Sequence, residues 1–276
     1  MLARKTGKMR IMTTDFPCTL WRASALVLLS LLSACAAPLT PLKPDVNLQG
    51  RQAELASEQA LDAEYLALQS SEGGQLQSVD GQGSQVRVLV FRGGKAPQVG
   101  HNHVLTVPAL RGWLWTPHKG LAGARFALEF RLDQLLIDAP EQRAALGPGW
   151  ASTLSAEDVA ATREHMLGGD NLQAGVFPWV RLRSVQVSGE APALAAEIEI
   201  ELHGQRQRQW IALHAEPSPQ GWQVRGSLVV RQSDYGVRPY SVLGGLLAVQ
   251  DELVIDFALQ TRPRPQEQKQ EQEPVH

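Results

Sequence analysis

The segment Val99-Gly-His-Asn-His-Val-Leu-Thr-Val-Pro-Ala-Leu-Arg-Gly-Trp-Leu-Trp115 decides the fold class of this chain. In a β-strand successive side chains point to opposite faces, so His101 and His103 share one face. Leu105 continues that face with an apolar side chain. Pro108 has no backbone N–H to give to a ladder, so a second strand is expected after it. The segment predicts a β-hairpin that carries two imidazoles among apolar neighbours.

Apolar and polar residues alternate along five further segments of the chain. Their ranges are 86–91, 126–132, 194–202, 222–230 and 253–259. Turn residues separate them, as in Ser218-Pro-Gln-Gly221. Many half-apolar strands joined by turns are typical of an antiparallel barrel or sandwich, so we predict an all-β domain.

One segment departs from this period of two. Ser155 is followed three residues later by Asp158, which is a capping-box variant at a helix start. Gly168 and Gly169 are typical of a helix end. We expect one short helix inserted between the strands.

The first residues have the pattern of an export signal. Residues 1–34 hold five Lys or Arg and one Asp, which gives a net charge of +4. Because the whole chain has a net charge of −2, residues 35–276 have a net charge of −6. An apolar run at 23–32 is shorter than the ~20 residues that span a bilayer, and suits the core of a signal peptide. Leu32-Ser-Ala-Cys35 looks like the lipobox of bacterial lipoproteins. We therefore predict a signal peptide over 1–34 and lipidation at Cys35, against the alternatives of a cut elsewhere or a buried apolar run.

Residues 35–84 are expected to tether the domain to a membrane. The proline-rich start should be extended. Residues 51–68 are rich in Ala, Leu, Glu and Gln, and either a docked helix or a partly helical linker fits them. Residues 70–84 are rich in Gly, Ser and Gln and are interpreted as a linker. Residues 261–276, with few apolar side chains, are predicted to be a disordered tail.

Several motifs resemble the YceI-like family of bacterial envelope proteins. They are Gly100-His-Asn-His-Val104, Arg163-Glu-His-Met-Leu167 with Phe177-Pro178 after it, and the closing block Arg231-Gln-Ser-Asp-Tyr-Gly-Val-Arg-Pro-Tyr-Ser241. The resemblance covers residues 85–260. It implies an antiparallel lipocalin-like β-barrel of about eight strands in the periplasm-facing envelope. The lipid anchor is expected from Cys35, and Ala36 rather than Asp after that cysteine resembles lipoproteins of the outer membrane, so the outer membrane is favoured. Some family members bind polyisoprenoid lipids, so the resemblance also implies a non-catalytic carrier of an isoprenoid or fatty derivative.

A small barrel can enclose one apolar ligand when its inward side chains leave room. The inward candidates are Leu105, Val107, Trp113, Phe126, Leu128, Phe130, Ile198, Ile200, Leu228 and Val230. The alternative is that these side chains fill the barrel themselves, which leaves a structural or interaction protein.

A second class of function is a metal- or redox-linked periplasmic protein that uses the histidines. His101 and His103 could both reach one metal ion, since imidazole suits zinc, copper or iron. His165 or His203 would have to supply a third ligand. The alternative is a structural role, in which each ring bonds to the protein.

The sequence gives no residues for catalysis. It lacks a Gly-x-Ser-x-Gly elbow, a His-Glu-x-x-His motif and a Gly-x-Gly-x-x-Gly fingerprint. Glu197, Glu199 and Glu201 alternate with isoleucine and are interpreted as a solvated face. Trp150, on a Gly-Pro loop, is expected to be exposed. The acidic remainder argues against nucleic acid as a partner, and we expect no cofactor other than an apolar lipid.

Overall fold

The computed structural model describes residues 46–264, all within one compact unit, Val46–His276. The predicted signal peptide, Cys35 and the tail from 265 onward lie outside the described residues. The helices are α1 (Val46–Glu72), α2 (Pro140–Ala145) and α3 (Ala156–Leu167). The strands are β1 (Gln75–Val79), β2 (Gln85–Gly93), β3 (His103–Thr106), β4 (Arg111–Thr116), β5 (Arg125–Arg131), β6 (Leu136–Ile137), β7 (Trp179–Glu190), β8 (Ala193–Leu202), β9 (Gln205–Ser218), β10 (Gly221–Arg231), β11 (Ser241–Val242) and β12 (Leu247–Pro263). Five 3-10 turns are η1 (Pro97–Val99), η2 (Leu132–Gln134), η3 (Pro148–Trp150), η4 (Gln232–Tyr235) and η5 (Leu243–Gly245).

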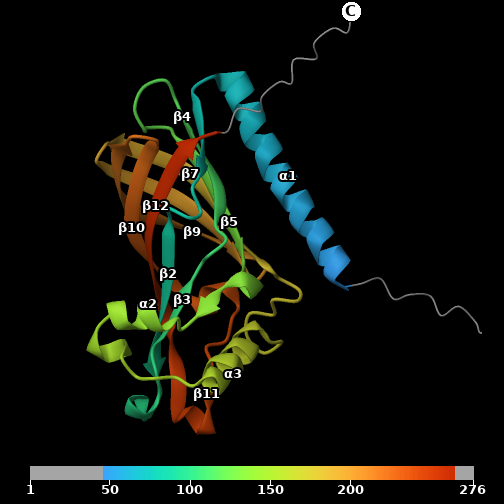
Figure 1. The fold of residues 1–276 in the computed structure, drawn as a ribbon, viewed down its shortest axis with the longest axis vertical. Coiled ribbons are helices and arrows are strands. Elements are labelled where there is room, and N and C mark those ends of the chain that lie inside the picture. The colour runs from blue at the N-terminus through green and yellow to red at the C-terminus, as the bar shows by residue number, and fades with distance from the viewer. Residues whose placement is uncertain (1–45, 265–276) are drawn as a thin grey trace, which may run out of the picture. The chain divides into compact units, whose positions relative to one another are not determined.

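Eight of these strands form a closed antiparallel barrel, which confirms the predicted fold class (Figure 1). Their order is β1-β4-β5-β7-β8-β9-β10-β12, and β12 returns to β1. Each strand puts one apolar face inward, so a single main core cluster runs through the barrel.

Strand β1 closes the barrel and lies in the segment that was predicted to be a linker. Its residues pair with β4 on one side and with the end of β12 on the other, where Gln77 lies opposite Pro263. Leu76 and Val79 are the only apolar residues of this strand, and its other residues are Gln and Ser. The polar composition of the segment therefore did not indicate a strand. The prediction of a linker over residues 70–84 is therefore wrong. The barrel begins at Gln75 rather than 85, and β12 extends past 260 to Pro263.

Strands β2, β3 and β6 extend the sheet along β12 beyond the point where β1 pairs with it. The predicted hairpin from Val99 to Trp115 is not formed, because β3 pairs with β2 and β6 while β4 pairs with β1 and β5. Pro108 lies between the two strands, where the chain passes from one part of the sheet to the other. Val107 is the last residue before it to bond β2, through its N–H to the carbonyl of Val86 at 3.2 Å.

Helix α3 begins as predicted. The Ser155 hydroxyl accepts from the N–H of Asp158 at 3.1 Å, and the carboxylate of Asp158 accepts from the N–H of Ser155 at 3.0 Å, which forms the capping box. The structure adds α2, which was not expected, and α1 covers the segment 51–68 for which a helix was one of two interpretations. No helix within residues 46–264 has the length and apolar character needed to cross a bilayer.

Helix α1 is docked on the outside of the barrel, which decides between the two interpretations of 51–68 (Figure 1). Leu61 and Tyr65 are buried against Leu76, Trp115 and Ala127. These residues form a second apolar cluster on the outer face of β1, β4 and β5. The barrel wall here is therefore covered on both sides.

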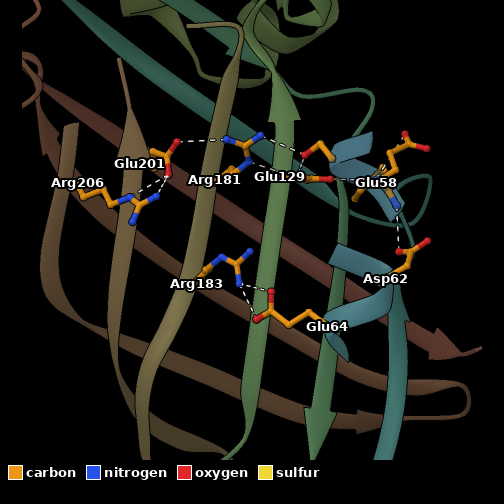
Figure 2. Close-up of polar contacts among 10 residues, drawn as sticks. Glu58, Asp62, Glu64, Glu129, Arg181, Arg183, Glu201 and Arg206 are labelled. Carbon is orange, nitrogen blue, oxygen red and sulfur yellow. Dashed lines mark hydrogen bonds and ion pairs between the residues drawn. The ribbon is translucent and has the colours of Figure 1, made fainter. Parts of the chain in front are cut away.

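Polar contacts also join α1 to the outer face of the barrel, as Figure 2 shows. Glu129 on β5 is only 4% exposed, and it accepts from Arg111 at 2.9 Å and from the Ser57 hydroxyl of α1 at 3.0 Å. Arg183 donates to both carboxylate oxygens of Glu64, each at 2.6 Å. Pairing of this kind allows carboxylates and guanidinium groups to lie under a helix.

The acidic stripe on β8 is paired as well, so its description as a solvated face needs correction for two of its three members. Glu201 contacts Arg181 at 3.2 Å and Arg206 at 2.8 Å, and Glu199 accepts from Arg208 at 2.9 Å. The side chains of both glutamates are about a quarter exposed. Neighbouring strands supply the arginines, a cross-strand arrangement that periodicity on one strand does not reveal.

Candidate functional site: an apolar cavity in the barrel

The barrel encloses an apolar cavity of about 150 Å³. Each of the eight strands of the closed barrel contributes to its lining, and so do β2 and the turn between β4 and β5. Thr261 is the one polar side chain among the lining residues, and its hydroxyl already donates to Gln77. The cavity therefore offers shape and apolar surface, and no charged group, to anything that enters it.

The cavity exists because inward positions on facing strands do not fill the available space. Phe126, Phe130 and Phe257 face the cavity but remain only partly buried. On β10 the inward position is Gly226, and a Cβ there would lie 2.6 Å from the ring of Phe257. A side chain at 226 would collide with that ring and with the carbonyl of Ala212, so glycine at 226 allows the ring to lie where it does.

Six of the ten predicted ligand residues border the cavity. They are Trp113, Phe126, Leu128, Phe130, Ile200 and Leu228. The other four, Leu105, Val107, Ile198 and Val230, are buried in the same core at 0 to 6% exposure and do not border the cavity. Periodicity predicted the inward face correctly for these four, but which inward residues leave room between them depends on packing in three dimensions.

Trp113 needs a further correction. Leu114 is the residue of β4 that joins the inner core, so alternation directs Trp113 toward the outer cluster. Its indole N–H donates to Asp62 of α1 at 2.8 Å. The tryptophan borders the cavity from β4 but is held by the outer helix.

The two candidate metal-binding histidines have separate protein partners. His101 precedes β3, is exposed, and its Nδ1 lies 3.2 Å from the Ser152 hydroxyl. His103 begins β3, and its Nδ1 lies 2.6 Å from a carboxylate oxygen of Asp138. Within residues 46–264 no group of three His, Cys, Asp or Glu could hold a metal ion. The arrangement fits histidines bonded to the protein.

Asp138 is a buried carboxylate that sequence reasoning missed. Its side chain is fully buried and accepts from His103, from the N–H of Val104 at 3.0 Å and from Arg143 at 2.6 Å. Burial alone would raise the pKa of Asp138, but these hydrogen bonds outweigh it and hold that pKa below its ordinary value. Arg143 also donates to Ser152, so the cluster joins β3, the residue after β6, α2 and the loop after η3.

Trp150 is buried at 8% exposure, contrary to the expectation for a Gly-Pro loop. It packs with Leu89 and Val104, and its ring meets that of Phe91 edge-on at 6.0 Å. The loop folds into α2 and η3 over the outer face of β2 and β3, which the sequence pattern of a single loop does not indicate. Trp150 is therefore part of a small core rather than an exposed contact.

Two crystal structures of bacterial proteins are similar to this chain. BcnA of Burkholderia cenocepacia is 13% identical, with 66% of this chain and 98% of BcnA covered at a TM-score of 0.48. The YCEI protein of Campylobacter jejuni is 6% identical, with 48% of this chain and 70% of that protein covered at a TM-score of 0.37. Neither a scan against protein-family models nor a search of the curated proteins gave a match.

Proposed function

We propose that this protein is a non-catalytic carrier that holds an apolar ligand inside its barrel. The observation that carries the proposal is the cavity of about 150 Å³ whose lining side chains are apolar except for Thr261. A long hydrocarbon such as a polyisoprenoid or a fatty derivative is the ligand class that such a lining favours. The proposal includes attachment to the bacterial envelope through lipidated Cys35.

The cavity is small for a long ligand, so binding such a ligand requires the cavity to expand. An apolar cavity of roughly 150 Å³ takes a molecule the size of benzene, whereas ligand pockets usually measure about 300–1,000 Å³. A chain-like ligand would therefore expand the cavity by moving side chains that are not tightly packed. The partly buried rings of Phe126, Phe130 and Phe257 are those side chains.

The test is native mass spectrometry of a chain comprising residues 46–276, purified without added lipid and then extracted with organic solvent. A retained mass that disappears on extraction is expected. If the purified protein is empty, farnesol is added as an isoprenoid probe, and saturable binding is expected.

A matched pair of variants locates the ligand. Ala215→Leu adds the same three carbons inside the cavity as Ala212→Leu adds on the exposed face of the same strand, β9. Loss of bound ligand in the first variant and retention in the second is expected. Equal binding by both variants, or no binding of farnesol by the unmodified chain, would overturn the proposal.

A further inference from the structure

Two loops meet at the end of the molecule where β11 lies (Figure 1). The backbone N–H groups of Lys95 and Ala96 each donate, at 3.0 Å, to the carbonyls of Gly245 and Leu246 respectively. The Lys95 ammonium donates to the carbonyl of Gly244 at 3.3 Å. The segment before β11 adjoins them, since the carbonyl of Tyr240 accepts from the N–H of Val249 on β12 at 3.0 Å. The loop after β2, the loop between β11 and β12 and this segment thus form one surface. We call it the tip surface and define it by Lys95, Val99, Arg238, Tyr240, Leu243 and Leu246.

The tip surface exposes large apolar side chains. Leu243 is 72% exposed, Val99 63%, Leu246 42% and Tyr240 38%. These are four of the ten large apolar residues that are exposed within residues 46–264. Such a concentration in adjoining segments marks an interaction surface, whereas single exposed apolar residues need no explanation.

Leu243 is costly to the fold as well as exposed. Its φ is +52°, in the left-handed region where a Cβ crowds the backbone, and Gly244 and Gly245 continue that conformation. Glycine would adopt this turn without steric cost. Leu243 buries little surface and strains the backbone, so neither packing nor turn chemistry explains a leucine at this position. We therefore attribute its presence to an interaction of its exposed apolar side chain.

The charged residues that belong to the segments of the tip surface are all cations. Residues 92–102 and 237–249 contain Arg92, Lys95 and Arg238 and no Asp or Glu. The first acids beyond them on β12 are engaged, since Asp251 accepts from Ser233 and Glu252 pairs with Arg231. These segments are thus apolar and cationic in a chain whose net charge is −2. Other acids near them in space are Glu164 and Asp170, which adjoin His165, packed on Tyr240, and Asn171, which donates to the carbonyl of Arg238.

We propose that the tip surface docks on an anionic lipid bilayer. Leu243, Leu246 and Val99 would enter the boundary between headgroups and acyl chains, while Lys95 and Arg238 would face the lipid phosphates. Exposed apolar side chains flanked by cations fit such a surface in both polarity and charge. This surface shares no residue with the cavity, so the inference does not depend on the proposed function.

The test uses residues 46–276, the compact unit that contains every described contact of the barrel and α1 and lacks Cys35. Co-sedimentation with vesicles of mixed phosphatidylglycerol and phosphatidylcholine is compared with phosphatidylcholine alone. Binding to the anionic vesicles is expected, and salt should weaken it. The double variant Leu243→Asp, Leu246→Asp should lower the affinity about tenfold or more, and Lys95→Ala about fivefold.

Two further variants keep the result interpretable. Leu243→Gly removes the side chain and relieves the backbone, so it should weaken vesicle binding while the thermal midpoint stays the same or rises. Val229→Asp places the same charge at a half-exposed valine on the outer face of β10 and should bind vesicles normally.

Three outcomes would overturn the inference. They are no binding of the unmodified chain to anionic vesicles, equal loss in the Val229 variant, and tip-dependent dimers in sedimentation analysis without vesicle binding. The last outcome would assign the surface to a second copy of the chain. Ligand retention is measured separately, so failure of the cavity proposal and failure of this one can be told apart.

Discussion

The two ends of the barrel core differ in how completely they are packed. At the filled end, Leu132, Leu135, Tyr235 and Val237 are 2 to 3% exposed. These residues come from η2, η4 and adjoining loops, and α3 packs against the same cluster. At the hollow end, which comprises the residues that line the cavity, many inward side chains are only partly buried.

This difference shows what each kind of element contributes to the barrel. Strand side chains project inward at fixed intervals and leave space near the axis, whereas 3-10 turns and a short helix can enter the mouth and fill it. None of the cavity-lining residues belongs to α2, α3 or a 3-10 turn. The hollow end is therefore the part of the core made by strands with no such insertion.

The largest expected effect concerns the polar cluster beside the filled end. Asp138→Asn would leave the Arg143 guanidinium, 6% exposed, without its charged partner. Removing one member of a buried pair typically costs about 3–5 kcal/mol, so we expect a loss of that size in urea unfolding at neutral pH. Arg125→Ala, which removes a half-exposed ion pair with Glu72, is the control and should cost under about 1 kcal/mol. Similar losses in both variants would contradict the assigned role of Asp138.

The same carboxylate predicts a pH dependence. Because folding lowers the pKa of Asp138 from 3.8, its stabilising contribution is complete above that value and is lost as the pH falls through the lower folded pKa. The difference in unfolding free energy between the unmodified chain and Asp138→Asn should stay level from neutral pH toward pH 4 and then shrink. Urea unfolding over that range measures it, and a difference that grew on acidification would refute the assignment.

A matched pair of leucines compares the two ends directly. Leu132→Ala at the filled end should cost about 3 kcal/mol because it opens a new void. Leu128→Ala at the hollow end should cost about 1–2 kcal/mol, since that side chain is already partly exposed. Chemical denaturation of the two variants makes the comparison. Equal costs would mean that the ends are equally packed.

Replacing alanine by leucine should change the unfolding free energy differently at two buried positions. Ala196 is fully buried and does not border the cavity, so Ala196→Leu overpacks the core and should cost about 1–3 kcal/mol. Ala215 borders the cavity, so Ala215→Leu should be neutral or stabilise by up to about 1 kcal/mol. Thermal unfolding of both gives the answer, and a strongly destabilised Ala215 variant would show that the cavity is not available.

The sequence was most informative where a local rule decides the structure. Alternation predicted the inner face of β8, and the Ser155–Asp158 capping box predicted the start of α3. Pairing between distant strands could not be predicted in the same way, so the supposed hairpin at Val99 to Trp115 was wrong. β1 was missed because Leu76 and Val79 are too few to stand out in a Gly- and Gln-rich segment.

The candidate site was predicted only in part. Phe126, Leu128 and Ile200 were correctly placed on the cavity, but Ile198 on the same strand as Ile200 is fully buried away from it. Trp113 borders the cavity, but Leu114 takes the inner position on β4 and the Trp113 indole bonds Asp62 of α1, which alternation in the sequence did not specify. A cavity is the volume that many side chains together leave empty, so no single residue pattern specifies it.

The position of β1 bears on the order in which the chain folds. The contact that closes the barrel joins Gln77 to Thr261, which are 184 residues apart. Such a distant pairing forms late and makes folding slow, because most of the chain must be ordered before its ends can meet. During synthesis the barrel stays open until β12 has been made, and its apolar interior is then exposed to solvent. Completion of the last strand is thus the step that separates an open, aggregation-prone sheet from a closed container.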